Sequence, residues 1–154
     1  MGVISGSILY ISIFLSVYVQ VFFLVTFFEN SKKIITRNER IKLKKYPSVT
    51  IIVPCFNEEK TVYKTVRSLL DLNYPKEKLK IFLIDDGSTD STWNAISKFL
   101  HYTNIKLFKK ENGGKYTALN LGLQNIETDF LGCLDADSFA HSESLVRIMS
   151  YFEH

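Results

Sequence analysis

The chain has 154 residues, 23% of them charged and 46% hydrophobic, with a formal net charge of +3, which is ordinary for one globular domain. The positive charge is concentrated: residues 29–46 carry seven Lys or Arg and two Glu, which leaves 12 basic and 14 acidic residues, a net −2, for the rest. A nucleic-acid-binding domain needs a basic excess on a folded face. The composition therefore argues against nucleic acid as a partner.

The N-terminal segment is the one departure from globular composition. Residues 1–28 contain no charged side chain, and a helix of that length exceeds the ~30 Å hydrocarbon core of a bilayer. We predict a membrane anchor over residues 1–28 and a basic linker over 29–46, which keeps the following domain in the cytoplasm and can contact anionic lipid headgroups. A cleaved signal peptide is the alternative, but the segment has neither a basic n-region nor a small-x-small cleavage site.

Short apolar runs alternate with stretches of helical periodicity over residues 47–154. The predicted strands are 49–53, 81–84, 105–108 and 130–134. The predicted helices carry these apolar side chains: Val62, Val66, Leu69 and Leu70; Trp93, Ile96, Phe99 and Leu100; Ala118, Leu119 and Leu121 to Leu123; Leu145, Val146, Ile148, Met149 and Phe152. This alternation predicts an α/β fold, Rossmann-like, with a mostly parallel sheet that helices cover on both faces.

Several local features refine this prediction. Pro54 is expected to end the first strand, and Ser88 or Thr89 to cap the second helix. Cys55 and Cys133 lie in apolar strands without metal-ligand spacing, so we expect both to be small core residues in a reducing compartment.

Acidic residues follow two of the predicted strands. Asp85 and Asp86 come after one strand, and Asp135 and Asp137 end a run that we expect to be buried. In a parallel sheet these strand ends meet at one edge, where ligands bind. Paired carboxylates there suit Mg²⁺ or Mn²⁺ completed by phosphate oxygens. The alternative is that Asp137, with Ser138, caps a helix that begins near residue 142.

The remaining strand ends supply complementary groups. In the stretch 111–115, adjacent glycines allow the backbone to approach a ligand and Lys115 provides a positive charge for phosphate. Phe56 can provide a flat face for a base, although a phenylalanine at such a position more often serves packing alone. Together these groups describe a nucleoside diphosphate with its metal.

Four motifs in this order resemble the nucleotide-sugar glycosyltransferases of family 2. They are Pro54-Cys55-Phe56-Asn57-Glu58-Glu59, Ile84-Asp85-Asp86-Gly87-Ser88-Thr89-Asp90, Asn112-Gly113-Gly114-Lys115 with Ala118-Leu119-Asn120, and Asp135-Ala136-Asp137. With a membrane span in front, the pattern looks most like processive polysaccharide synthases, which make poly-N-acetylglucosamine, hyaluronan or cellulose. The resemblance covers residues 47–154.

The resemblance implies a GT-A fold and a set of donor-binding residues. Asp86, with Asp85, would bind a uracil-like base against Phe56, and Lys115 would approach the diphosphate of a UDP-sugar. Asp135 would contact ribose or diphosphate, and Asp137, with Asp135, would hold the Mg²⁺ or Mn²⁺. The other donor-binding residues that the motifs imply are Pro54, Asn57, Glu58 and Gly114.

Beyond the Asp-x-Asp, the family also carries an acidic residue that serves as general base for the acceptor hydroxyl, an acceptor-binding motif and further membrane helices. The sequence given has no counterpart of them. His141 and Glu143 are candidates for a replacement general base, although capping or solvation explains both. We therefore expect an incomplete donor-binding domain over residues 47–154, with a second polypeptide as one source of the missing half. Two alternatives remain: a non-catalytic, membrane-anchored nucleotide-binding subunit, and an aspartyl-phosphate phosphatase or receiver.

Overall fold

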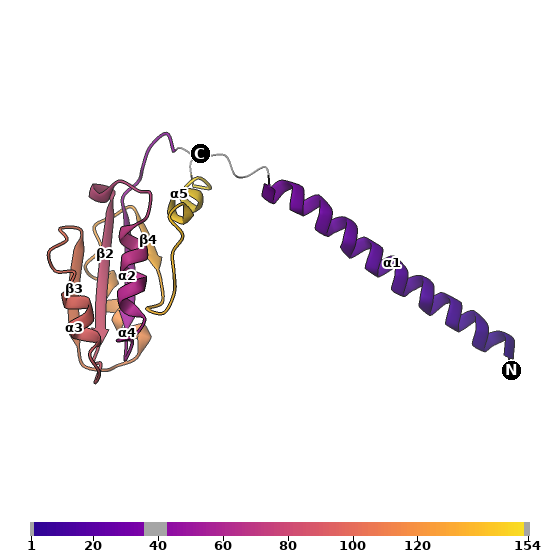
Figure 1. Cartoon of the computed structure of the whole chain (residues 1–154), viewed down its shortest axis with the longest axis horizontal. Helices are drawn as coiled ribbons and strands as arrows, with labels where there is room; N and C mark the ends of the chain where they lie inside the picture. Colours follow the sequence, from indigo (N-terminus) through magenta and orange to yellow (C-terminus); the bar gives the residue numbers. More distant parts are fainter. Residues whose placement is uncertain (1, 36–42, 153–154) are drawn as a thin grey trace. The chain divides into compact units, whose positions relative to one another are not determined.

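The computed structural model describes residues 2–35 and 43–152, with side chains over 6–29 and 43–152. It contains two separate units, residues 1–40 and 41–154. The first is a single helix, α1 (Gly2–Ile35), and its stretch Gly6–Glu29 is long and apolar enough to cross a membrane by length and composition (Figure 1).

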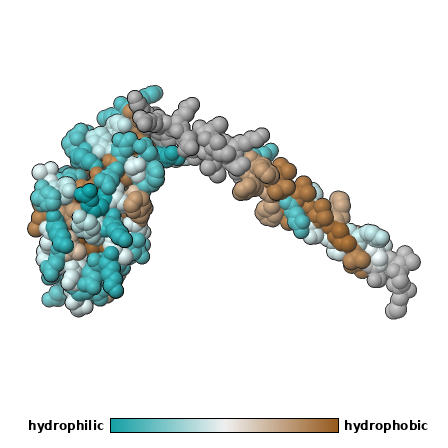
Figure 2. Space-filling view, in the orientation of Figure 1, coloured by the Kyte–Doolittle hydropathy of each residue, from teal (hydrophilic) through white to brown (hydrophobic). Residues whose placement is uncertain are grey.

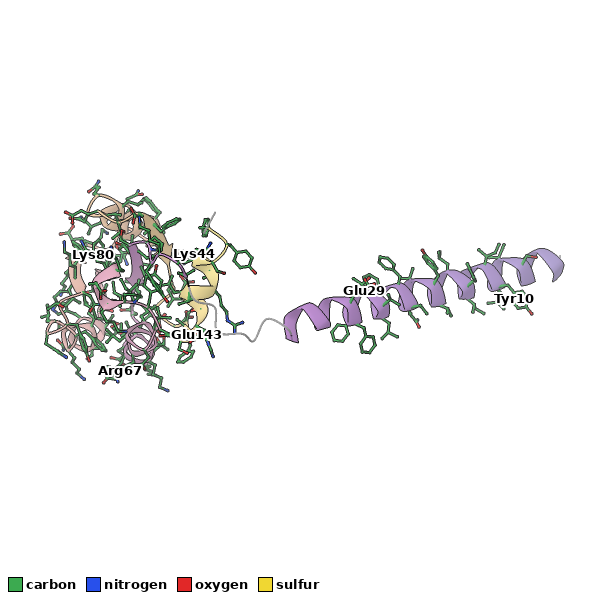
Figure 3. The ribbon with its side chains drawn as sticks, turned by 90° about the horizontal axis from the view of Figure 1, so that it is seen from above. Tyr10, Glu29, Lys44, Arg67, Lys80 and Glu143 are labelled. Atoms are coloured by element: carbon green, nitrogen blue, oxygen red, sulfur yellow. The ribbon has the colours of Figure 1, made fainter. Side chains whose placement is uncertain are left out.

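The side chains of α1 fit an apolar surrounding rather than a packed core. Large apolar residues project on all sides of the helix, among them Tyr10 and Phe14 with 76% and 73% of their surface exposed (Figures 2 and 3). A helix that is apolar all round is stable when protein or lipid surrounds it. Of the predicted anchor, residues 2–28 lie within this helix, residue 1 lies outside the described residues, and insertion into a membrane stays a prediction.

The second unit is built on a four-stranded parallel sheet. Its strands are β1 (Val49–Cys55), β2 (Leu79–Asp86), β3 (Ile105–Lys110) and β4 (Phe130–Cys133), in the order β3-β2-β1-β4. The helices are α2 (Val62–Leu70), α3 (Thr92–Ser97), α4 (Lys115–Leu123) and α5 (Ser144–Met149), and a 3₁₀ helix, η2 (Lys76–Lys78), precedes β2. The predicted Rossmann-like α/β alternation is confirmed.

The sheet separates two apolar layers because successive strand residues point to opposite faces. On one face, Val53 and Leu83 pack with Val66 of α2, Ile96 of α3 and Val146 of α5. On the other face, Ile52, Phe82 and Ile84 pack with Ala118 of α4. Helices therefore cover both faces, as predicted.

β1 and β2 run further toward the site than predicted, whereas β4 ends one residue earlier. β1 continues through Pro54 to Cys55, so the prediction that Pro54 ends the strand is wrong. The carbonyl of Ile52 accepts a hydrogen bond from the amide of Leu134, so Pro54, two residues later, faces the same side. Since β4 has already ended at Cys133, the missing N–H of Pro54 costs no ladder hydrogen bond. β2 likewise includes Asp85 and Asp86.

The run that ends in Asp135 is not a buried strand. β4 lies at the edge of the sheet, Leu131 is 45% exposed, and Cys133 is exposed, whereas Cys55 is buried as predicted. Sequence periodicity cannot distinguish an edge strand from a central one when both are short and apolar. The predicted core role of Cys133 is therefore wrong.

Three helix details also differ from prediction. Residue Ser91, not Ser88 or Thr89, is the N-cap of α3, and the Asp90 carboxylate accepts the Thr92 amide. α4 begins at Lys115, three residues before the predicted apolar stretch. Leu100, Ile148 and Phe152 are exposed, because α3 and α5 are only one to two turns long and pack one side against the sheet.

Candidate functional site

A cavity of about 390 Å³ opens at the carboxyl ends of the strands. Its lining comes from the segment after β1, the end of β2, the turn before α4 and the segment after β4: Pro54, Cys55, Phe56, Glu58, Asp86, Asn112, Gly114, Lys115, Asp135, Ala136 and Asp137. Residues separated by 83 positions in the sequence thus share one site, as the parallel topology requires.

Eight of the predicted site residues line this cavity. The sequence did not indicate three of the lining residues, Cys55, Asn112 and Ala136, each of which lies within two positions of a predicted one. Their side chains are small or uncharged, so their residue types do not suggest a binding role. Only their positions within the four motifs could have indicated them.

Asp86 is the most enclosed carboxylate of the lining. Its Oδ1 accepts hydrogen bonds from Lys110 Nζ at 2.5 Å and from the Gly113 amide at 3.2 Å, and its side chain is 4% exposed. Burial by itself raises the pKa of Asp86, but the hydrogen bonds from Lys110 and Gly113 outweigh it and hold the pKa below its usual value. Asp86 is therefore an ionised acceptor near neutral pH.

Asp85 and Asn57 do not line the cavity but organise its walls. Asp85 is fully buried, and its Oδ1 accepts the Ser88 amide. Asn57 adopts a left-handed backbone (φ 55°), and its Oδ1 accepts the Thr89 amide at 2.9 Å. The Asn57–Thr89 bond joins the loop after β1 to the loop after β2, and the Asp85–Ser88 bond holds the second loop against the end of β2.

The Glu58–Glu59 stretch strengthens this connection. The Glu58 amide donates to Thr92 Oγ1 at 2.7 Å, and the Glu59 amide donates to Asp90 Oδ2 at 3.1 Å. The Glu58 carboxylate accepts the hydroxyl of Thr61. The predicted motif residues thus act partly by fixing the loops from which Phe56 and Glu58 reach the cavity.

Lys115 and Asp135 face each other in the cavity. Lys115 Nζ lies 2.5 Å from Asp135 Oδ1, and the two side chains are 56% and 54% exposed. This hydrogen bond raises the pKa of Lys115. Gly114 precedes Lys115 with φ 89°, a backbone conformation that favours glycine and starts α4 at the cavity.

Asp137 remains available for a ligand. To other residues that the structure describes, its carboxylate makes no hydrogen bond or salt bridge. The alternative that Asp137 and Ser138 cap the following helix is wrong, because α5 begins at Ser144 with Glu143 as its N-cap.

The carboxylates of the cavity suit a metal that also binds the phosphate oxygens of a substrate. Over residues 43–152, no three His, Cys, Asp or Glu side chains cluster as a complete metal site. Asp135 and Asp137 do provide two carboxylates in the cavity lining. Mg²⁺ is commonly held by one or two carboxylates and completed by water and substrate phosphates, so these residues fit it.

The two candidates for a replacement base lie outside the cavity lining. His141 Nδ1 accepts the Glu143 amide at 3.2 Å, and Glu143 Oε1 accepts Asn73 Nδ2 at 2.9 Å. Both interactions are structural. Cys55 does line the cavity, but burial first, and then the nearby charges of Asp85 and Glu58, raise the pKa of its thiol to about 12. Cys55 is therefore protonated and is not a nucleophile.

Comparisons with known proteins agree with this geometry. The family model described as "Glycosyl transferase family 2" matches residues 50–154. Poly-beta-1,6-N-acetyl-D-glucosamine synthase from Staphylococcus aureus is 31% identical over 156 residues, which cover 96% of this chain and 36% of that protein. The chain therefore spans about a third of the length of this relative.

Solved structures share the same fold. Staphylococcus aureus TarS 1–349 in complex with UDP-GlcNAc has a TM-score of 0.62 and 28% identity, over 68% of this chain and 31% of that one. A mannosyltransferase from Pyrobaculum calidifontis, solved with GDP-Man and Mn²⁺, has a TM-score of 0.68 over 84% of this chain and 40% of that one; at 23% identity it supports the fold alone. With the family model matching all the strands and the cavity, the chain belongs to glycosyl transferase family 2.

Proposed function

We propose that this chain binds a nucleotide-sugar, a UDP-sugar in particular, together with Mg²⁺ or Mn²⁺, as the donor-binding part of a membrane-anchored glycosyltransferase in polysaccharide or glycolipid synthesis. One observation carries the proposal. A single cavity collects an enclosed, ionised acceptor (Asp86), a cation (Lys115) and two carboxylates (Asp135 and Asp137). A base, a diphosphate and a divalent metal need these groups.

Each part of the donor has a complementary partner. The ionised carboxylate of Asp86 can only accept hydrogen bonds, so it favours a base whose hydrogen-bonding edge carries an N–H, such as uracil. Phe56 is 46% exposed in the lining and offers its ring to that base. Asp135 is placed for ribose or diphosphate, and Asp137, with Asp135, for the metal. Lys115 moves from Asp135 to the phosphate oxygens.

The metal, when bound, neutralises the charge that develops on the departing nucleoside diphosphate. Lys115 adds a second positive group at the same place. The acceptor hydroxyl also needs a base, and we propose that this base comes from beyond residues 1–154, in the same or a second polypeptide. The positions of His141 and Glu143 outside the lining support this.

The comparisons support the choice of donor, and the apolar helix α1 supports the location. TarS was solved with UDP and with UDP-GlcNAc, and the relative at 31% identity is named for a polymer of N-acetylglucosamine. We propose that α1 stays attached as a single-pass anchor and that the basic residues after it keep the catalytic unit in the cytoplasm.

Calorimetry on the full chain in detergent tests the proposal. We expect UDP to bind in the presence of Mn²⁺, binding to fall at least tenfold in EDTA, and Asp137→Ala to reproduce the EDTA result. Asp71→Ala, which removes an exposed carboxylate at the end of α2, is the matched control and should bind normally. Equal affinity for UDP in wild type and Asp137→Ala, with or without metal, contradicts the metal role.

A further inference from the structure

Two hydroxyl side chains of α2 are buried although the helix has a full apolar face. Thr65 is 2% exposed and Ser68 is 3% exposed. They are three residues apart and therefore lie on one side of the helix. Burying a hydroxyl costs free energy unless it is hydrogen-bonded. Their partners belong to the segment after β4, which carries Asp135 and Asp137.

Each hydroxyl binds the backbone of that segment. Thr65 Oγ1 donates to the Ala136 carbonyl at 2.7 Å, and both groups are buried. The Ser68 hydroxyl donates to the Thr65 carbonyl at 2.7 Å, so its oxygen is free to accept the Ala140 amide at 3.0 Å. α2 thus satisfies a carbonyl and an amide of a segment that no longer belongs to the sheet.

The contact continues beyond α2. The Asn73 amide donates to the Ser142 carbonyl at 2.8 Å, and Asn73 Nδ2 donates to Glu143 Oε1. Residues 136–143 are therefore attached at four points to α2 and the turn that follows it. These hydrogen bonds fix the backbone of residues 136–143 beside the cavity, although the segment is neither helix nor strand.

The Thr65 bond acts at the residue between the two carboxylates. Ala136 is 4% exposed and packs in the core beside α2, whereas Asp135 and Asp137 are exposed. Residues 135–138 form a turn, which the Ser138 amide closes by donating to the Asp135 carbonyl at 3.0 Å. With Ala136 held in the core at this turn, the exposed carboxylates on either side of it line the cavity. The carbonyl that Thr65 binds belongs to the peptide unit that leads into Asp137.

We propose that Thr65 and Ser68 are positioning residues that hold Asp135 and Asp137 in the geometry required by the metal and the diphosphate. The proposal rests on the proposed function and deepens it. Neither hydroxyl lines the cavity, so both act through the Asp135–Ala140 backbone. Groups that orient metal ligands commonly change metal affinity ten- to a hundredfold when removed.

Thr65→Val tests this with little change in shape. It leaves the buried Ala136 carbonyl without its partner, and we expect Mn²⁺-dependent UDP affinity, measured by calorimetry on the full chain, to fall about tenfold. UDP binding in EDTA should not change, because the base end of the cavity is untouched. Thr65→Ser restores the hydroxyl and should restore affinity, and Ser68→Ala should act in the same direction as Thr65→Val.

Thr50→Val is the matched control. Thr50 is also fully buried and also bonds through its hydroxyl, to Thr128 Oγ1 at 2.7 Å, but it lies near the opposite end of β1. This variant should lose thermal stability like Thr65→Val and keep the metal-dependent affinity. An equal loss of affinity in the two variants overturns the proposal, because general destabilisation then accounts for the effect.

Amide hydrogen exchange separates this inference from the proposed function. In Thr65→Val and Ser68→Ala we expect amides of residues 135–141 to exchange about tenfold faster, while amides of β1 and β2 do not change. If the wild type fails to bind UDP with Mn²⁺ but the exchange result holds, the proposed function fails and the positioning of the segment stands. Unchanged exchange over 135–141 in both variants overturns the inference whatever the wild type binds.

Discussion

Asp86 and Lys110 form the most enclosed ion pair among the described residues, with side chains 4% and 21% exposed. The sequence predicted Asp86 as a site residue from its place after a strand. It did not indicate Lys110, because the pairing depends on β2 and β3 being neighbours with Asp86 beside Lys110 in register. For Lys115 and Asp135 the sequence predicted both residues but not their ion pair, which forms because the fold brings the start of α4 beside the segment after β4.

We predict that Lys110→Met destabilises the fold by about 3 kcal/mol, because it leaves a buried carboxylate without its cation. The variant should also change the pH dependence of stability. The pKa of Asp86 is lowered in the folded state. Its contribution is therefore present above the unfolded-state pKa of about 3.9 and is lost as pH falls through the folded value.

Thermal melts of the full chain in detergent between pH 7 and pH 3 provide the measurement. Wild type should lose stability at the acidic end of the range more steeply than Lys110→Met. Lys80→Met is the control, since Lys80 pairs with Glu127 at the surface, where solvent screens the pair, and should contribute little to stability. If the stability of wild type and Lys110→Met depends on pH in the same way, the pairing with Lys110 does not lower the pKa of Asp86.

At the scale of elements, the order of strands and helices could be predicted because it depends on local periodicity. The ends of strands and helices could not be predicted, because they depend on which elements lie beside them in the fold. Pro54 stays in β1 only because β4 has ended beside it, and the exposure of Cys133 follows from the edge position of β4. Leu100 fits a helical pattern but lies beyond the end of α3 and is 64% exposed.

The stability lost when an apolar side chain is truncated should depend on its burial in the observed layers, not on its place in the helical sequence pattern. Phe82 is 1% exposed and fills the layer between the sheet and α4 with Ile52, Ile84 and Ala118. We predict that Phe82→Ala costs about 3–5 kcal/mol, whereas Leu100→Ala stays within about 0.5 kcal/mol. Chemical denaturation of the two variants checks this, and comparable losses mean that Leu100 belongs to the core.

At the scale of the whole molecule, the apolar stretch Gly6–Glu29 is followed by basic residues over 29–46 and by a mildly acidic sequence over residues 47–154. We predict that protease added to intact cells leaves residues 47–154 undigested, while protease added to inverted membrane vesicles degrades them. A cytoplasmic marker protein controls for the integrity of the cells. Digestion from outside, or a mature N-terminus near residue 30, supports a cleaved signal peptide instead.

The proposed function requires that one cavity holds a nucleoside diphosphate and a metal against Asp135 and Asp137. Electron paramagnetic resonance of Mn²⁺ bound to the full chain, with detection of phosphorus coupling, tests it most directly. We predict that UDP introduces a phosphorus coupling on protein-bound Mn²⁺ and that this signal is absent in Asp137→Ala and present in Asp71→Ala. If UDP binds to the wild type but its phosphorus shows no coupling to Mn²⁺, the metal does not contact the diphosphate and the proposed function is contradicted.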